Sequence, residues 1–149
     1  MVKVFFGCSM RGGQGVVNSE ELAKFPDAIE ALGFELASRH QTKAGIIQEE
    51  NKLTKTHIHD RDYKWVTESD FGVFEISNPS LGVGAEISDL IHLGKPVLCL
   101  YKKGLEEKVS AYILGKMGSK YIQPPFECYA YQDLEDAKEK IKQFAKKSL

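Results

Sequence analysis

Short apolar runs alternate along the chain with longer segments in which apolar residues recur at helical spacing. The short runs predict buried strands, and the longer segments predict amphipathic helices. Strands are expected at residues 2–8, 34–38, 71–76 and 96–101, with shorter extended pieces within 121–131. Helices are expected at 19–32, 56–69 and 106–117, between Ser80 and Gly94, and after a capping Asp133.

Two segments interrupt this pattern. Pro26 lies inside 19–32 and predicts a kink or a fresh helix start, because proline cannot complete the hydrogen bond to the preceding turn. Residues 43–54 are polar and lack periodicity, and they predict a loop.

Strands separated by helices indicate a parallel sheet covered by helices on both faces. Ligands of such sheets bind beyond the carboxyl ends of the strands. This rule places four polar segments on one rim of the molecule, namely 9–13, His40, 80–86 and 101–103.

Residues 77–86 follow the strand at 71–76 and lead into a helix. Free backbone N–H groups and the positive end of the helix dipole make such a loop an anion site, to which Ser80 adds a hydroxyl donor. We expect Glu86 in the first turn of the helix, where the dipole favours its ionised form and makes it a candidate nucleophile or base. The alternative is a βα turn whose glycines serve only packing and whose glutamate only stabilises the helix.

Asp62 is the second candidate carboxylate. Helical spacing aligns it with Ile58, Trp65 and Val66, so it is expected to point with the apolar stripe. A carboxyl group in apolar surroundings keeps its proton to higher pH, as a general acid requires. The alternative is a helix-border aspartate that pairs with Arg61 or Lys64.

One ionised and one protonated carboxyl group suit cleavage of a glycosidic bond. Ser9, Arg11 and Ser80 provide for a phosphate group nearby. The loop at residues 7–13 matches neither a Walker loop nor a dinucleotide fingerprint, which disfavours ATP and NAD. His57 and His59 are two residues apart and diverge on a helix, so they are a poor metal pair.

Composition indicates one soluble domain over residues 1–149, with 42% hydrophobic and 28% charged residues. The net charge of −1 gives no electrostatic case for a nucleic-acid polymer or a membrane as partner. Three cysteines lack paired or metal-like spacing, and the start of the chain lacks a signal-peptide layout. These features predict a cytoplasmic protein.

Three motifs resemble those of the 2′-deoxynucleoside 5′-phosphate N-hydrolases, in the wider nucleoside 2-deoxyribosyltransferase superfamily. They are Cys-Ser-Met-Arg-Gly-Gly at 8–13, His-Asp-Arg-Asp-Tyr-Lys-Trp at 59–65 and Pro-Ser-Leu-Gly-Val-Gly-Ala-Glu at 79–86. Their order and spacing match the family from about Val4 to the last helix. The resemblance implies a three-layer, flavodoxin-like (Rossmann-like) α/β fold of about five strands, a homodimer with shared active sites, and no metal or organic cofactor.

The resemblance also implies roles for individual residues. Glu86 would be the nucleophile that forms a glycosyl-enzyme intermediate, and Asp62 its acid–base partner. The 5′-phosphate would be held by Ser9, Arg11, Gly12, Gly13, Ser80 and Gly82, with Ser110 supplied by the partner subunit. Phe5, Met10 and His40 would contact the sugar or the base.

Phe5 departs from the family, which usually has a tyrosine whose hydroxyl touches the nucleophile and crowds the sugar 2′ position. A branch that cleaves ribonucleotides such as CMP resembles this chain in having phenylalanine there. Our hypothesis is an N-glycosidase that acts on nucleoside 5′-monophosphates, with a narrow preference for deoxyribonucleotides. The alternatives are a base-exchanging deoxyribosyltransferase, a ribonucleotide-preferring hydrolase, a non-catalytic nucleotide-binding module and a structural dimer.

Overall fold

The computed structural model describes residues 1–9, 17–39 and 51–149, and within them five parallel strands form one sheet in the order β2-β1-β3-β4-β5. The strands are β1 (Lys3–Cys8), β2 (Glu35–Leu36), β3 (Phe71–Glu75), β4 (Val97–Lys102) and β5 (Phe126–Tyr131). This order is that of flavodoxin-like folds, so the expected fold class is confirmed.

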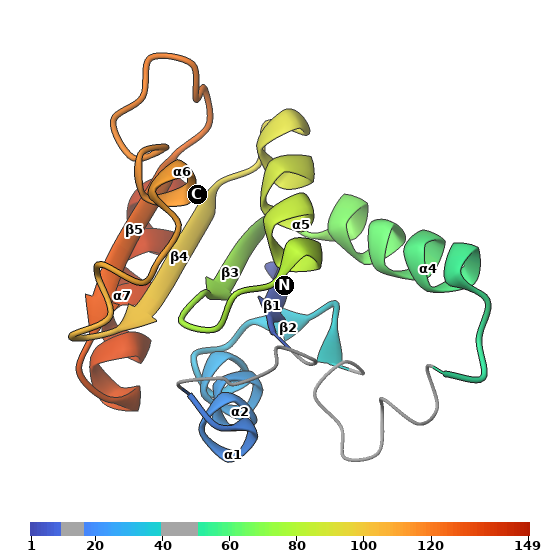
Figure 1. Cartoon of the computed structure of the whole chain (residues 1–149), viewed down its shortest axis with the longest axis horizontal. Coiled ribbons are helices and arrows are strands. Elements are labelled where there is room, and N and C mark those ends of the chain that lie inside the picture. Colours follow the sequence, from blue (N-terminus) through green and yellow to red (C-terminus); the bar gives the residue numbers. More distant parts are fainter. Residues whose placement is uncertain (10–16, 40–50) are drawn as a thin grey trace.

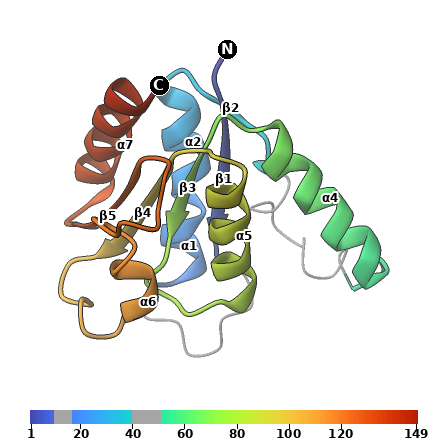
Figure 2. The same cartoon turned by 90° about the horizontal axis from the view of Figure 1, so that it is seen from above.

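Helices cover both faces of the sheet (Figures 1 and 2). On one face lie α1 (Ser19–Leu22), α2 (Lys24–Ala31) and α7 (Leu134–Ser148). On the other lie α4 (Lys55–Glu68), α5 (Leu81–His92) and α6 (Ala111–Leu114). In the part of the chain that is described, no helix is both long and apolar enough to cross a membrane.

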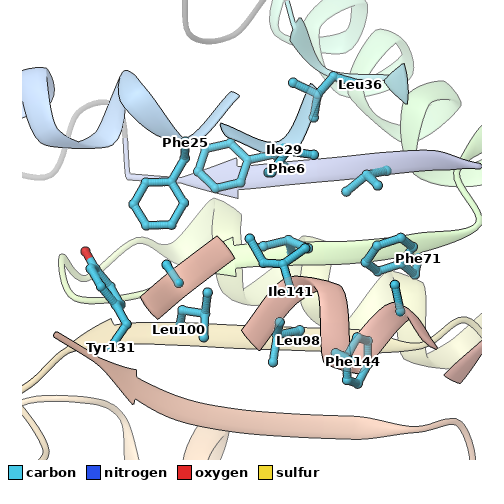
Figure 3. Close-up of a cluster of buried hydrophobic side chains, with 14 residues drawn as sticks. Phe6, Phe25, Ile29, Leu36, Phe71, Leu98, Leu100, Tyr131, Ile141 and Phe144 are labelled. Carbon is cyan, nitrogen blue, oxygen red and sulfur yellow. The ribbon is translucent and has the colours of Figure 1, made fainter. Parts of the chain in front are cut away.

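Each face of the sheet carries its own hydrophobic cluster. In β1, Phe6 joins the cluster beneath α2 and α7, and Phe5 joins the cluster beneath α4 and α5, because successive strand residues point to opposite faces. Figure 3 shows the first cluster, where side chains of three strands meet two helices: Phe6, Phe71, Leu98, Phe25, Ile29, Ile141 and Phe144. The central strands β1, β3 and β4 are therefore apolar along most of their length, because both of their faces are buried.

The second strand is shorter than the 34–38 expected from the sequence. Beyond Leu36, the side chain of Ser38 takes the place of strand-to-strand backbone hydrogen bonds. Phe6 N–H donates to Ser38 Oγ at 3.0 Å, and the Ser38 hydroxyl donates to the Phe6 carbonyl at 2.8 Å. A buried side-chain hydroxyl thus satisfies both backbone groups of Phe6.

The expected interruption at Pro26 is a fresh helix start. The break between α1 and α2 lies at Ala23, so Pro26 is the third residue of α2. Proline is tolerated in the first turn of a helix because no N–H group there has an intrahelical partner.

The helix expected at 106–117 is wrong in extent, because only Ala111–Leu114 is helical. Ser110 leaves the helical region, with ψ at 122°, and its Oγ accepts from Ile113 N–H as the N-cap. Gly104 and Gly118 have positive φ values of 96° and 82° and make turns on either side. Val109 and Ile113 have helical spacing, but both pack from this turn-rich segment into the second cluster.

The remaining expectations agree with the structure within a few residues. Asp133 caps α7 by accepting from Asp136 N–H, as expected, and Thr54, which was not predicted as a cap, caps α4 by accepting from His57 N–H. The extended pieces expected within 121–131 include a full strand, β5. The loop expected at 43–54 lies mostly outside the described residues.

Candidate functional site

The segment after β3 places Ser80 at the start of α5. Ser80 has an extended backbone and is the N-cap, and its Oγ accepts from Val83 N–H at 3.2 Å. The first N–H groups of α5 therefore lie at the carboxyl edge of the sheet, beside a hydroxyl that is still able to donate. The strand, loop and helix start expected from the sequence are confirmed here, and the binding of an anion by them stays a prediction.

Gly82 and Gly84 do not serve tight packing. A Cβ atom at Gly84 would meet nothing within 4 Å, and one at Gly82 would meet only Ser80 Oγ at 3.9 Å. Neither glycine has a positive φ. The packing alternative for this loop therefore lacks support, and the glycines leave the start of α5 open to close approach.

Glu86 lies in the second turn of α5, which corrects the expectation that it lies in the first. The helix begins at Leu81, and its first turn holds no acidic residue. Because the dipole effect falls off within the first turn, it does not explain why Glu86 would be ionised.

The charge of Glu86 is felt at the end of β1. Burial, with the nearby charges of Glu75 and Glu86, raises the pKa of the Cys8 thiol to about 12. Glu86 is thus close enough to the carboxyl end of β1 to act on Cys8. Its side chain is half-buried.

Ser9 follows β1 at the same edge. Its side chain is buried, and its Oγ is a hydroxyl for which the described part of the chain provides no hydrogen-bond partner. Leaving a buried hydroxyl unpaired costs about 1–3 kcal/mol, so such groups in native proteins call for an explanation. A ligand oxygen is one such explanation.

Asp62 lies on α4, which packs beside α5 (Figures 1 and 2). Its side chain is 22% exposed, and Oδ1 accepts from both Nε and Nη2 of Arg61 at 2.8 Å. The Arg61 guanidinium in turn stacks over the Trp65 ring, 4.8 Å from its centroid. Asp62 is therefore partly buried, as expected, and it also makes the Arg61 pair that was the structural alternative.

Phe5 is fully buried, with its ring 5.7 Å from that of Phe74. In this conformation it has no surface to offer a sugar, so it would act through the residues packed over it. Five of the predicted site residues lie outside the described residues, namely Met10, Arg11, Gly12, Gly13 and His40.

A cavity of about 490 Å³ lies on the α6 side of α5 and is lined by Ser80, Gly84, Lys108 and Ser110, among others. Neither Glu86 nor Asp62 nor Ser9 lines it. In Figure 2, α5 separates α6 from α4. Ser80 and Ser110 thus border the same cavity, whereas Glu86 is not among its lining residues.

Two buried polar residues at this edge were missed by sequence reasoning. Asn78 accepts from Val17 N–H at 3.0 Å and donates to the Val17 carbonyl at 2.7 Å. Glu75 is 1% exposed at the end of β3. An acidic residue that closes an otherwise apolar run was the available signal for Glu75, whereas nothing in the local pattern identifies the partner of Asn78.

Comparison with known proteins identifies relatives over nearly the whole chain. A protein of Thermofilum pendens with the provisional name 2′-deoxynucleoside 5′-phosphate N-hydrolase 1 is 32% identical over 140 residues, which cover 94% of this chain and 92% of the relative. The 5-hydroxymethyl-dUMP N-hydrolase of Danio rerio is 33% identical over 135 residues, which cover 90% of each chain.

Among solved structures, the CMP N-glycosidase of Clostridium botulinum has the same fold, with a TM-score of 0.66 at 16% identity. It matches over 95% of this chain and 98% of its own. No family model matches the sequence. The extent and identity of the matched relatives show that this chain belongs to the 2′-deoxynucleoside 5′-phosphate N-hydrolase family.

Proposed function

We propose that the protein is an N-glycosidase that hydrolyses the base–sugar bond of nucleoside 5′-monophosphates, releasing free base and a sugar 5-phosphate. The observation that carries this proposal is the meeting of two loop ends at one sheet edge. Ser9, whose Oγ has no partner among the described residues, and the open start of α5 both lie at this edge, and the charge of Glu86 acts on Cys8 beside Ser9. The names of the relatives describe the same class of reaction.

In the proposed mechanism, the Glu86 carboxylate attacks the anomeric carbon and forms a glycosyl-enzyme intermediate. Asp62 donates a proton to the leaving base and then accepts one from the water that resolves the intermediate. In the described structure, Arg61 is positioned to influence this proton transfer, because its Nε donates a hydrogen bond to Asp62 and its Nη2 forms an ion pair with the same oxygen. The reaction as proposed needs no metal or organic cofactor, and activity that survives chelation would support this.

The substrate phosphate is proposed to bind Ser9, Ser80 and the backbone at Gly82. Arg11, Gly12 and Gly13 are proposed to complete this site. Backbone N–H groups at the start of a helix of 12 residues suit an anion, and the absence of a side chain at Gly82 allows close approach. Met10 and His40 are proposed to contact the base.

We further propose a homodimer in which Ser110 serves the partner's active site. Within one chain Glu86 does not line the cavity that Ser110 borders, and an active site that combines the two residues is proposed to form between chains. Leu81 and Tyr112 are 97% and 79% exposed on the same side, and exposed apolar side chains of this size favour a protein interface.

The test of the activity is incubation with a panel of deoxyribonucleoside and ribonucleoside monophosphates, with the free base followed by chromatography. Release of base from the nucleotides is the expected result, with deoxyribonucleotides favoured narrowly. Exchange of bases without hydrolysis would identify a deoxyribosyltransferase, and a clear preference for CMP would identify a ribonucleotide hydrolase. Tight binding without release would indicate a binding module, and no binding a structural protein.

The sugar preference is proposed to depend on Phe5. We expect Phe5→Tyr to shift the ratio of kcat/KM toward deoxyribonucleotides, because the added hydroxyl would crowd the 2′ position. Unchanged selectivity would show that Phe5 does not read the sugar.

A free nucleotide as substrate and three free thiols, those of Cys8, Cys99 and Cys128, support a cytoplasmic location.

A further inference from the structure

Glu75 is a buried acid that the proposed chemistry leaves unused. Its side chain lies at the end of β3 and is 1% exposed. Both oxygens accept a hydrogen bond, Oε1 from Ser77 N–H at 2.6 Å and Oε2 from the Tyr131 hydroxyl at 2.8 Å. Burial raises the pKa of Glu75, although the two donors partly oppose this effect. Burying a carboxyl group lowers the stability of the folded protein, so the presence of Glu75 at this edge calls for a reason.

The contacts of Glu75 organise the segment that leads to α5. Ser77 donates its backbone N–H to Glu75. The Oγ of Ser77 in turn accepts a hydrogen bond from Lys102 N–H at 2.8 Å. Glu75 therefore links the ends of β3 and β5, and Ser77 links the ends of β3 and β4. The next residue, Asn78, is tied to Val17 by its two hydrogen bonds.

Ser80 follows this anchored segment directly. Pro79 separates it from Asn78, and proline restricts the backbone of the residue before it. Few free dihedral angles thus remain between the Glu75 contact and the hydroxyl that caps α5. An anchor at Ser77 and Asn78 sets where Ser80 Oγ and the first N–H groups of α5 point.

We propose that Glu75 is a positioning residue for the phosphate site, whose buried carboxyl group holds the segment from Ser77 to Ser80 so that Ser80 and the start of α5 face the substrate phosphate. This inference rests on the proposed function. Glu75 does not touch the substrate, because it is buried and both its oxygens are occupied by protein donors.

Other ionisable groups face Glu75 from three elements. They are Cys8 on β1, Glu21 on α1 and Tyr131 on β5. Glu21 is itself paired with Lys102 Nζ at 2.8 Å. Because these groups respond to the charge of Glu75, the test must distinguish the loss of its hydrogen bonds from the loss of its charge.

Tyr131→Phe and Tyr129→Phe form a matched pair for this test. Both tyrosines lie on β5 and donate to a glutamate, but Tyr129 donates to Glu127, away from the segment before α5. The measurements are KM and kcat for dCMP, the inhibition constant of deoxycytidine, and the affinity for inorganic phosphate by calorimetry. Deoxycytidine reports the sugar and base contacts without the phosphate.

For Tyr131→Phe we expect KM for dCMP and the dissociation constant of phosphate to rise by about tenfold, the usual effect of one charged buried hydrogen bond. The inhibition constant of deoxycytidine and kcat should stay within about twofold of wild type. Tyr129→Phe should leave all four quantities unchanged. Glu75→Gln, which can still accept from Ser77 N–H, should behave like wild type more closely than Glu75→Leu does.

Equal losses in phosphate and deoxycytidine affinity would indicate general destabilisation and overturn the proposal. So would a Glu75→Gln protein that is as impaired as Glu75→Leu, because a loss of charge would then explain the effect. Should Glu75→Leu fail to fold, the tyrosine pair and Glu75→Gln decide the question. If wild type releases no base, the proposed function fails, and phosphate calorimetry still tests the role of Glu75.

Discussion

Two serine hydroxyls at the carboxyl edge differ in how the folded chain uses them. Ser80 accepts a backbone hydrogen bond as the cap of α5 and keeps its own proton free for a ligand. Ser9 Oγ is buried without a partner among the described residues, so it has both roles open. At the scale of single residues, the site therefore offers donors that the fold itself does not consume.

Glu86 is the residue on which the proposed chemistry depends most directly. We expect Glu86→Gln to lower kcat for base release by at least about a thousandfold, because the amide cannot form the glycosyl-enzyme intermediate. The matched control is Glu139→Gln, an exposed change on α7 that should leave turnover and Tm unchanged. Wild-type turnover in Glu86→Gln would remove Glu86 from its role.

Glu75 gives a prediction about stability and pH. Its pKa is raised by burial above the ordinary 4.5, so the unfolded chain loses this proton at a lower pH than the native protein does. Its contribution to stability is therefore fully present below about pH 4.5 and is lost as pH rises through the native pKa. We expect Glu75→Gln, which does not titrate, to gain stability relative to wild type as pH rises.

The measurement is Tm of both proteins from pH 4 to pH 8. Tyr131 does not interfere, because burial and the charge of Glu75 raise its pKa well above this range. A constant difference in Tm across the range would contradict the prediction.

At the scale of elements, helix ends in this protein are set by contacts from elsewhere in the chain. The carboxyl end of α4 is capped by Lys95, whose Nζ donates to the carbonyl oxygens of Val66, Thr67 and Ser69 at 3.0, 2.6 and 2.5 Å. A cation satisfies orphan carbonyl groups and also complements the helix dipole. Lys95 thereby fastens the helix that carries Asp62 to the segment before β4.

We expect Lys95→Met to lower the free energy of unfolding by about 1–2 kcal/mol, because the methionine keeps the stem but leaves the carbonyls to water. Lys64→Met is the control on the same helix. Lys64 is exposed and lies 3.8 Å from Glu68, so its loss should change stability by less than about 0.5 kcal/mol. Equal midpoints of urea unfolding for the two variants would show that the Lys95 cap contributes nothing specific.

At the scale of the whole molecule, Ser110 and the exposed apolar side chains gather beside α6. Glu86 does not line the cavity beside α6, whereas Leu81 and Ser110 do, and the exposed Tyr112 lies on α6 itself. A homodimer with shared sites would bring Ser110 of one chain to the Glu86 side of the other. This arrangement predicts complementation between two defective chains.

We expect Glu86→Ala and Ser110→Ala, each impaired alone, to recover activity when co-expressed with different tags and purified as the mixed dimer. One site of that dimer then holds Glu86 from one chain and Ser110 from the other. Activity no higher than that of Ser110→Ala alone would show that Ser110 acts within its own chain.

Light scattering gives the mass of the protein in solution, and Leu81→Asp should yield monomers if the exposed face is the interface.

The sequence by itself determined the fold class, because apolar runs and helical periodicity report burial of whole elements. It also identified the loop at Ser80, since a strand, glycines and a helix start are contiguous in the chain. Only the tertiary structure decided on which turn of α5 Glu86 lies and that Asp62 pairs with Arg61. It also showed that the helix expected at 106–117 is limited to Ala111–Leu114. It alone joined Glu75 to Tyr131, which are 56 residues apart, because hydrogen bonds between distant segments leave no periodic trace in a sequence.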